Sequence, residues 1–148
     1  CIAGDGSIMM NIQELQSVVE YNLPIKIIII NNNGYQSIRQ TQKAYFSDNI
    51  FGTGSDDGVS FPDFIKIAKA FNIKSKKILS VSSWLSKNTQ QLLLSIEPVV
   101  FDVVVDDSQG FTPKLSSKKL KDGSMISSSL EDMSPFLSQA EMKKNKFY

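Results

Sequence analysis

Two short polar stretches near the N-terminus carry groups that suit a metal ion bound together with phosphate. They are Gly4-Asp5-Gly6-Ser7 and the run Asn31–Gly34. Asp5 offers an anionic oxygen, the Asn32 side chain offers a neutral oxygen, and the turn at Gly34 offers a backbone carbonyl oxygen. Oxygen ligands suit Mg²⁺, which keeps its other coordination positions for water and phosphate. The two stretches therefore predict a magnesium–diphosphate site.

The small residues of the first stretch favour a phosphate ligand. Gly4 and Gly6 have no Cβ, so a ligand can approach the backbone closely at these positions. Ser7 stands where we expect the first helix to begin, and there its N–H and hydroxyl groups can bind a phosphate oxygen.

A helix and a strand are predicted between the two stretches. Apolar residues recur at three- and four-residue steps from Ser7 to Tyr21, which indicates an amphipathic helix, and Asn22-Leu23-Pro24 ends it. The run Ile25–Ile30 is rich in β-branched residues, which is typical of a central parallel strand.

These elements explain how residues far apart in the sequence can share one site. The 24 residues between Gly6 and Asn31 form a strand–helix–strand crossover, which brings both strand ends to one edge of a parallel sheet. We therefore expect Asp5 to lie beside the Asn31–Gly34 run. Open α/β sheets bind ligands at such an edge.

Helices and strands are predicted to alternate in the same way up to residue 107. The further elements are helices over 37–46, 61–71 and 82–95 and strands over 74–79 and 99–105. This order predicts an α/β fold, a three-layer sandwich with a mostly parallel central sheet. The last helix is expected to begin at a capping serine, Ser82 or Ser83. Its four apolar side chains are expected to point inward: Trp84, Leu85, Leu92 and Leu93.

Two features of this region have more than one interpretation. Segment 47–60 is rich in Gly, Asp and Ser and is predicted to be a loop, either a lid or disordered, which we expect to be mobile. Arg39 and Lys43 either contact phosphate or substrate or lie on a solvated helix face, and we favour the solvated face.

The composition is that of an ordinary globular domain. Of the 148 residues, 41% are hydrophobic and 21% are charged, and the net charge of +1 gives no reason to expect nucleic-acid binding. The chain has no histidine, which excludes histidine-based acid–base and metal chemistry within it, and one cysteine, which excludes an internal disulfide framework. No apolar run reaches the ~18 residues of a membrane span, and the cytoplasm is the simplest compartment to expect.

Gly4-Asp5-Gly6 is followed after 24 residues by Asn31-Asn32. This spacing resembles the signature of thiamine-diphosphate-dependent enzymes, in their diphosphate-binding domain. Further stretches, Met9–Leu15 and Asn22-Leu23-Pro24, resemble the acetolactate synthase branch. The stretch Asn31–Arg39 is most similar to acetolactate-synthase-like proteins associated with cell-surface sugar biosynthesis. The resemblance covers roughly residues 1–110 and implies the thiamine-diphosphate-binding fold.

The resemblance also implies roles for individual residues. Thiamine diphosphate would be anchored by Mg²⁺, with Asp5, the Asn32 side chain and the Gly34 carbonyl as the metal ligands. The residues expected to contact the cofactor are Gly4, Asp5, Gly6, Ser7, Asn32, Gly34 and Tyr35. Related decarboxylases have a catalytic glutamate six residues after the metal-binding asparagine. That position is Ile38 here, which favours a ligase-type pocket in which Ile38 contacts the substrate.

The resemblance places the rest of the active site outside this chain. In the family, the glutamate that activates the cofactor belongs to a second domain, of the PYR type, usually on a partner subunit. We therefore assign no catalytic residue here, expect a homodimer or homotetramer, and expect this chain alone to be inactive.

The expected activity is that of an acetolactate-synthase-like carboligase, a transferase. It would decarboxylate a small 2-oxo acid, pyruvate, and transfer the acyl unit to an acceptor carbonyl. The alternatives are a 2-oxo-acid decarboxylase, which is a lyase, and a non-catalytic module for cofactor binding or subunit assembly. A Mg²⁺–nucleotide enzyme is disfavoured because the chain lacks Gly-x-Gly-x-x-Gly and a Walker Gly-Lys pair.

The chain is expected to hold one domain core followed by a tail. Cys1-Ile2-Ala3 is predicted to end a buried strand, which indicates a C-terminal fragment of a longer enzyme. We assign residues 1–107 to the diphosphate-binding core, truncated at its N-terminus. Residues 108–148, rich in Ser and Lys, are expected to be a tail that either docks on a neighbouring domain or is partly disordered.

Overall fold

A central parallel sheet organises the first part of the chain in the computed structural model, which describes residues 1–46 and 49–145. The chain divides into two compact units, residues 1–109 and 110–148. The sheet of the first unit has the strand order β1-β2-β4-β3, and every pairing is parallel. Its strands are β1 (Ile2–Gly4), β2 (Lys26–Asn31), β3 (Lys74–Ile78) and β4 (Val99–Val104).

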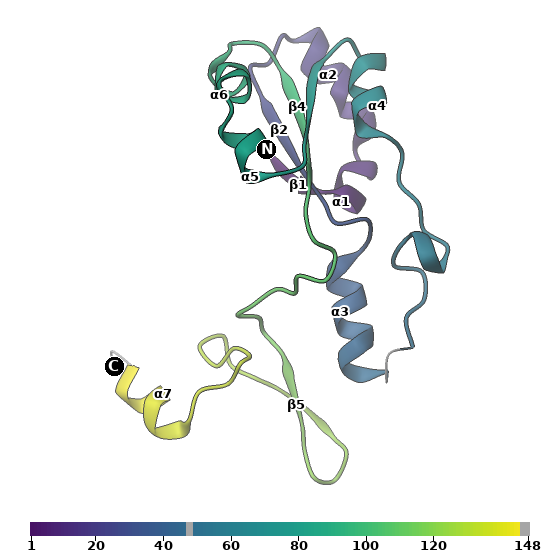
Figure 1. Cartoon of the computed structure of the whole chain (residues 1–148). Coiled ribbons are helices and arrows are strands. Elements are labelled where there is room, and N and C mark those ends of the chain that lie inside the picture. Colours follow the sequence, from purple (N-terminus) through teal and green to yellow (C-terminus); the bar gives the residue numbers. More distant parts are fainter. Residues whose placement is uncertain (47–48, 146–148) are drawn as a thin grey trace. The chain divides into compact units, whose positions relative to one another are not determined.

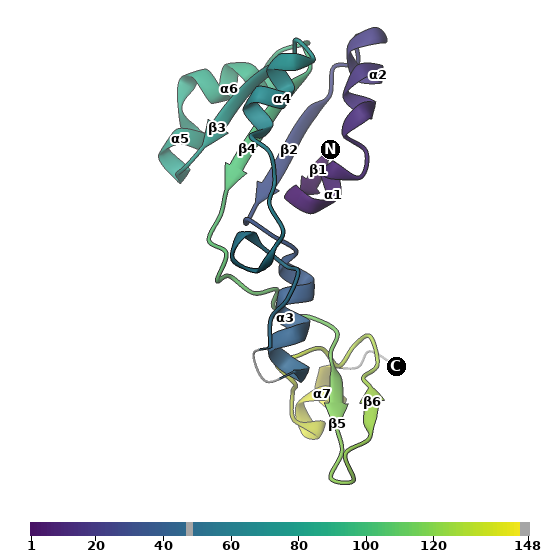
Figure 2. The ribbon, with the colours of Figure 1, turned by 90° about the vertical axis from the view of Figure 1, so that its right-hand side faces the viewer.

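Helices cover both faces of this sheet (Figures 1 and 2). On one face, α2 (Leu15–Glu20) and α4 (Phe64–Ala70) pack on β2 and β4 in a buried cluster formed by Leu15, Val18, Ile27, Ile29, Phe64, Ala68, Ile73 and Val100. On the other face, α5 (Val81–Leu85) and α6 (Lys87–Leu94) pack on Ile78, Val99 and Phe101. The predicted α/β fold with a parallel sheet is confirmed.

The first crossover differs from the single helix that the periodicity predicts. It consists of α1 (Asp5–Met9), the 3₁₀ turn η1 (Ile12–Glu14) and α2. The helix is interrupted at Asn11, whose backbone (φ −134°, ψ 27°) is not helical; asparagine competes for such positions because its side chain favours local turns. Helix α1 begins at Asp5, so Ser7 lies within it rather than at its start.

The second face also carries two helices where one was predicted. Ser86 has an extended backbone (φ −61°, ψ 146°) that separates α5 from α6, and its Oγ accepts from the N–H of Thr89. The cap of α5 is Ser80, which accepts from the N–H of Ser83, so the expected cap at Ser82 or Ser83 is wrong. Leu85, the last residue of α5, is 65% exposed and not inward as predicted.

The remaining helices of the first unit follow the prediction more closely. Helix α3 runs over Gln36–Tyr45, and the short turn η2 covers Ser55–Asp57. Helix α4 begins after Asp63, whose carboxylate accepts from the N–H groups of Ile65 and Lys66. Within the described residues, no helix combines the length and apolar character needed to cross a bilayer.

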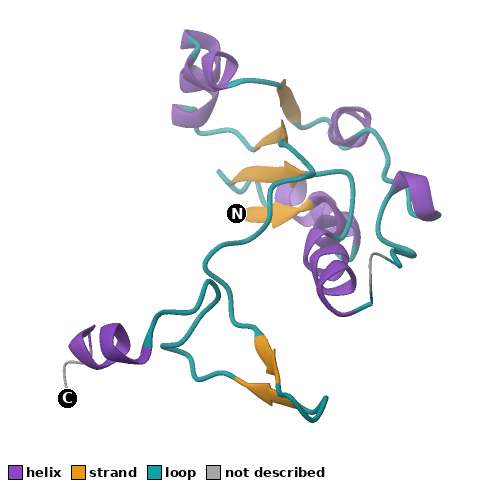
Figure 3. Ribbon diagram, turned by 60° about the horizontal axis from the view of Figure 1, so that its bottom comes forward, coloured by secondary structure: helices purple, strands orange, loops and turns teal. Residues whose placement is uncertain are grey.

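The second unit contains a hairpin and a short helix. Strands β5 (Ser117–Lys119) and β6 (Met125–Ser127) pair antiparallel, and α7 spans Gln139–Asn145 (Figure 3). Apolar side chains such as Leu130 and Phe136 are exposed in this unit. The docking role of residues 108–148 and the assignment of residues 1–107 to a truncated core stay predictions.

Candidate functional site

The two polar stretches meet at the carboxyl edge of the sheet. Asp5 follows β1 and is 2% exposed. Its Oδ1 accepts from the N–H of Gly6 at 2.7 Å, and its Oδ2 accepts from the N–H of Gly34 at 2.9 Å. The crossover therefore brings Asp5 against the run that follows β2, as the spacing predicts. Each carboxylate oxygen keeps a second lone pair for a further ligand.

Asn32 carries an unsatisfied oxygen in the same stretch as Gly34. Its Oδ1 is buried and has no hydrogen-bond partner among the residues that the structure describes. Buried side-chain oxygens are bonded in the large majority of cases, because an unmade bond costs about 1–3 kcal/mol. A cation would satisfy this oxygen, so the donor set of Asp5, Asn32 and the Gly34 carbonyl fits a Mg²⁺ ion.

Only one carboxylate belongs to this donor set. In residues 1–46 and 49–145, no three His, Cys, Asp or Glu side chains gather into a group that could hold a metal. A site with one anionic and two neutral oxygens is expected for Mg²⁺, which binds proteins through one or two carboxylates and takes further oxygens from phosphates and water.

A buried aspartate supports the asparagine run from the sheet. Asp102 on β4 is 2% exposed, and its Oδ1 accepts from Asn31 Nδ2 at 2.9 Å. The Oδ1 of Asn31 in turn accepts from the N–H of Asn33 at 3.2 Å. Lys77 Nζ lies 3.8 Å from the other Asp102 oxygen. We did not predict this role, although an aspartate within the apolar run Val99–Val105 is a signal for it.

Tyr35 lies directly on Gly6. A Cβ added to Gly6 would stand 2.2 Å from Tyr35 Cε1, and the Tyr35 ring meets the Phe61 ring edge-on at a centroid distance of 5.6 Å. The space expected for a ligand at Gly6 is thus taken by the Tyr35 ring. Gly4 is more open, since its added Cβ would meet only Ser7 Oγ, at 3.7 Å, and Ser7 itself is exposed.

Gly6→Ala is expected to lower the free energy of unfolding by about 1–3 kcal/mol, because the new methyl group overlaps the Tyr35 ring. Urea unfolding of the single variants and of Gly6→Ala combined with Tyr35→Ala measures the coupling. The cost of the alanine should shrink when the ring is absent. An equal cost in both backgrounds would contradict the packing of Tyr35 on Gly6.

Residues 49–60 form a folded segment that is attached to the asparagine run. Gly34 and Gly54 form an antiparallel bridge, and the N–H of Tyr35 donates to Thr53 O at 2.7 Å. Asn33 Nδ2 also donates to Ser55 Oγ at 2.8 Å. Residues 47 and 48 of the predicted loop lie outside the described residues. The described part is therefore folded and bonded to the asparagine run, and the mobility expected of this loop stays a prediction.

The Asp57 carboxylate forms hydrogen bonds within segment 49–60. It accepts from the N–H of Gly54 and from the hydroxyl and the N–H of Thr53. The Gly54 N–H, followed by the two Thr53 groups and the charge of Arg39, lowers the pKa of Asp57 below its usual 3.8. A lowered pKa in the folded state means that the contribution of Asp57 to stability is present above pH 3.8 and is lost as the pH falls through the lower value.

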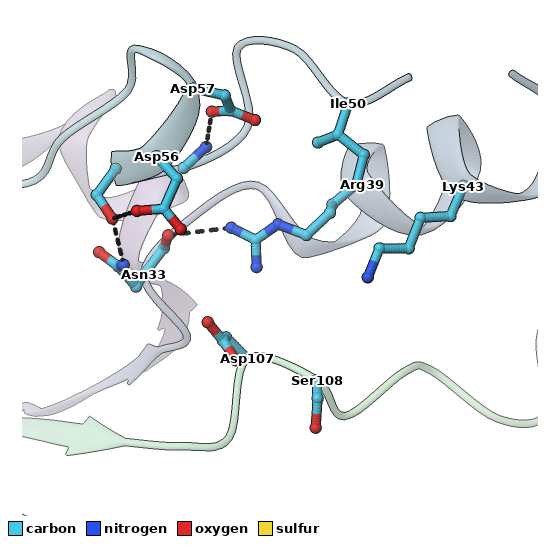
Figure 4. Close-up of a pocket in the computed structure, with 10 residues that line it drawn as sticks. Asn33, Arg39, Lys43, Ile50, Asp56, Asp57, Asp107 and Ser108 are labelled. Atoms are coloured by element: carbon cyan, nitrogen blue, oxygen red, sulfur yellow. Dashed lines mark hydrogen bonds between the residues drawn. The ribbon is translucent and has the colours of Figure 1, made fainter. Parts of the chain in front are cut away.

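Arg39 and Lys43 project from α3 into a pocket of about 390 Å³ (Figure 4). The pocket is lined by Asn33, Arg39, Lys43, Ile50, Gly54, Ser55, Asp56, Asp57, Asp107 and Ser108. Arg39 is half-buried and bonded to several protein oxygens, so the prediction that it lies on a solvated face is wrong, whereas Lys43 is exposed. Ile38 is 48% exposed, and its contact with a substrate stays a prediction.

Comparisons with known proteins show the family of this chain. Residues 1–103 match the family described as "Thiamine pyrophosphate enzyme, C-terminal TPP binding domain". The chain therefore belongs to the thiamine pyrophosphate enzymes, as their C-terminal cofactor-binding domain.

Acetolactate synthases are among the relatives. The chain is 37% identical over 123 residues to the acetolactate synthase large subunit of Pyropia yezoensis, covering 80% of this chain and 20% of the relative. It is 34% identical over 119 residues to that of Parasynechococcus marenigrum (strain WH8102), covering 80% and 19%. The chain thus spans about a fifth of the length of these relatives.

A solved structure shares the fold. The thiamine diphosphate-dependent 4-hydroxybenzoylformate decarboxylase of Rhodococcus jostii RHA1 superposes with a TM-score of 0.60 at 24% identity, over 72% of this chain and 20% of that one. At this identity, the likeness supports the fold alone.

Proposed function

We propose that this chain binds the diphosphate of thiamine diphosphate through Mg²⁺, as the C-terminal domain of a longer acetolactate-synthase-like enzyme. The observation that carries the proposal is the buried, unpartnered Asn32 oxygen in the run that contacts Asp5. Asp5, Asn32 Oδ1 and the Gly34 carbonyl would hold the metal. Gly4, Ser7 and Tyr35 would border the diphosphate, and Gly6, which lies beneath the Tyr35 ring, would serve it through its bond to Asp5.

The bound cofactor would supply an electron sink for decarboxylation of a 2-oxo acid. The residues of this chain would bind and orient it: the buried Asp5 fixes the charge at the metal, and the sheet edge fixes the two stretches relative to each other. The activating glutamate would come from a PYR-type domain of the same or a partner chain, in a homodimer or homotetramer. Ile38 would contact the substrate.

The proposed reaction is carboligation, in which pyruvate is decarboxylated and its acyl unit is transferred to an acceptor carbonyl. The names of the relatives support this class, and so does Ile38 at the position where related decarboxylases have a glutamate. The second candidate is a simple 2-oxo-acid decarboxylase on the same fold, and it is disfavoured because this chain lacks that glutamate.

Product analysis of the full-length protein with pyruvate, in the presence and absence of a second carbonyl compound, distinguishes the two reactions. A carboligase is expected to give a hydroxyketone product, such as acetolactate when pyruvate is also the acceptor. Free acetaldehyde as the sole product under both conditions would support the decarboxylase instead. The same assay on the 148-residue chain alone is expected to show no turnover of pyruvate.

A further inference from the structure

The side chain of Arg39 joins two segments that are separate in the sequence. From α3, its Nη2 donates to Asn33 O at 3.1 Å and to Thr53 O at 3.3 Å. Its Nη1 donates to Gln36 Oε1 at 3.2 Å, which orients the guanidinium on its own helix. Figure 4 shows the Arg39 side chain extended toward Asn33 across the pocket wall. One planar group thus bonds to the asparagine run and to segment 49–60 at the same time.

Two glycines make room for this guanidinium. A Cβ on Gly34 would stand 2.2 Å from Arg39 Nη2 and 2.1 Å from Thr53 O, which is backbone and cannot move aside easily. A Cβ on Gly54 would stand 2.4 Å from the same Nη2. The glycines at these positions are therefore needed for the close approach of Arg39 as well as for the Gly34–Gly54 bridge.

Thr53 connects Arg39 to the opposite charge of Asp57. Thr53 is fully buried, its N–H and Oγ1 both donate to Asp57 at 2.8 Å, and its carbonyl accepts from both Tyr35 and Arg39. The Arg39 Nε lies 3.4 Å from Thr53 Oγ1. We call Arg39, Thr53 and Asp57 the loop clamp. Its hydrogen bonds reach the backbone on each side of Gly34.

Gly34 is the point where the loop clamp acts on the candidate site. Its N–H donates to Asp5 Oδ2, and its carbonyl is one of the three proposed metal oxygens. The backbone of Gly34 is fixed on one side by Asn33 O bonded to Arg39, and on the other side by Tyr35 N bonded to Thr53. A shift of this backbone would move the Gly34 carbonyl and the neighbouring Asn32 oxygen together.

We propose that Arg39 is a positioning residue, which with Thr53 and Asp57 holds the Asn32–Gly34 backbone in the geometry that binds Mg²⁺ and diphosphate. This inference rests on the proposed function for its consequence in binding, but the contact with the backbone stands on the geometry alone. Arg39 does not touch the cofactor in this account; it acts through Asn33 and Thr53.

The test uses the full-length protein with Arg39→Ala and Arg39→Lys, and with Lys69→Ala as a control that removes an exposed cation from α4. Calorimetry measures the affinity for thiamine diphosphate at saturating and at limiting Mg²⁺. Hydrogen exchange followed by mass spectrometry measures the protection of the peptide that covers residues 31–36, without any cofactor.

Arg39→Ala is expected to weaken Mg²⁺-dependent binding by about 10-fold, the lower end of the loss when a partner of a metal ligand is removed, because Arg39 bonds to Asn33, which lies between two proposed ligands, and not to a ligand itself. It should also speed exchange in residues 31–36 but not in β2 and β4. Arg39→Lys should recover part of the affinity, because an ammonium can donate to the Asn33 and Thr53 carbonyls as Nη2 does, but it lacks the nitrogens that bond to Gln36 Oε1 and Thr53 Oγ1. Lys69→Ala should match the wild-type protein in both measurements.

Wild-type affinity and wild-type exchange in a folded Arg39→Ala protein would overturn the inference. If Arg39→Ala does not fold, Arg39→Gln, which keeps a polar side chain but removes the guanidinium that bonds to Asn33 O and Thr53 O, is tested in its place with the same criteria. If the wild-type protein does not bind thiamine diphosphate, the proposed function fails. The exchange of residues 31–36 then still decides whether Arg39 holds this backbone.

Discussion

Replacing Asp5 by alanine in the full-length protein is expected to abolish Mg²⁺-dependent binding of thiamine diphosphate. The substitution removes the only carboxylate of the donor set and both of its bonds to backbone N–H groups, those of Gly6 and Gly34. A hard divalent cation gains most of its binding energy from anionic oxygen, so the two remaining neutral oxygens cannot replace the loss. Calorimetric titration of cofactor at fixed Mg²⁺ measures the effect.

Two further variants accompany this substitution. Asp5→Asn keeps the shape of the side chain but removes the charge and replaces one of the two accepting oxygens with an NH₂ group, so it can keep only one of the bonds to Gly6 and Gly34, and it is also expected to lose Mg²⁺-dependent binding. Glu20→Ala removes an exposed carboxylate from α2 and should leave binding unchanged. Wild-type affinity in Asp5→Ala would contradict the assignment of the metal site.

Asn32→Leu is expected to change binding and stability in opposite directions. The unpartnered Asn32 oxygen costs the metal-free protein about 1–3 kcal/mol, and an apolar side chain of similar size removes that cost. The melting temperature without metal should therefore stay equal or rise, while Mg²⁺-dependent cofactor binding is lost. Differential scanning calorimetry with and without Mg²⁺ and cofactor measures both effects.

Measuring binding and melting temperature together distinguishes a metal ligand from an amide that serves only the fold. If Asn32 served only the fold, its replacement would lower the melting temperature of the metal-free protein. Asn49→Leu serves as a control, because Asn49 is exposed and should change neither property. A destabilised Asn32→Leu protein that still binds cofactor with wild-type affinity would show that the oxygen has a different role.

The meeting of the two polar stretches could be predicted because it follows from the chain direction alone. The chain between Gly6 and Asn31 forms a helical crossover and one strand, and a parallel crossover has to return to the same edge of the sheet. The contact between the Gly34 N–H and Asp5 at 2.9 Å is the consequence. The strongly apolar strands β2 and β4 were predictable for similar local reasons.

The contacts that support the site could not be predicted, because they join segments with no shared period or motif. Arg39 resembles a surface cation when α3 is considered alone. It joins α3 to segment 49–60 only because Thr53 O, which accepts from the Tyr35 N–H, lies within its reach. Asp102 on β4 accepts from Asn31 on the neighbouring strand β2, and these two side chains meet because of the register between the strands. The helix breaks at Asn11 and Ser86 fall at single polar residues that also fit a continuous helix.

The central claim is that this chain carries the Mg²⁺–diphosphate half of a thiamine diphosphate site. Calorimetric titration of thiamine diphosphate with and without Mg²⁺, on the full-length protein and on the 148-residue chain, with intact mass measured for both, tests it most directly. The account predicts tight binding by the full-length protein that requires Mg²⁺, and weak or no binding by the chain alone. No binding by the full-length protein in the presence of Mg²⁺ would contradict it and would favour a non-catalytic module.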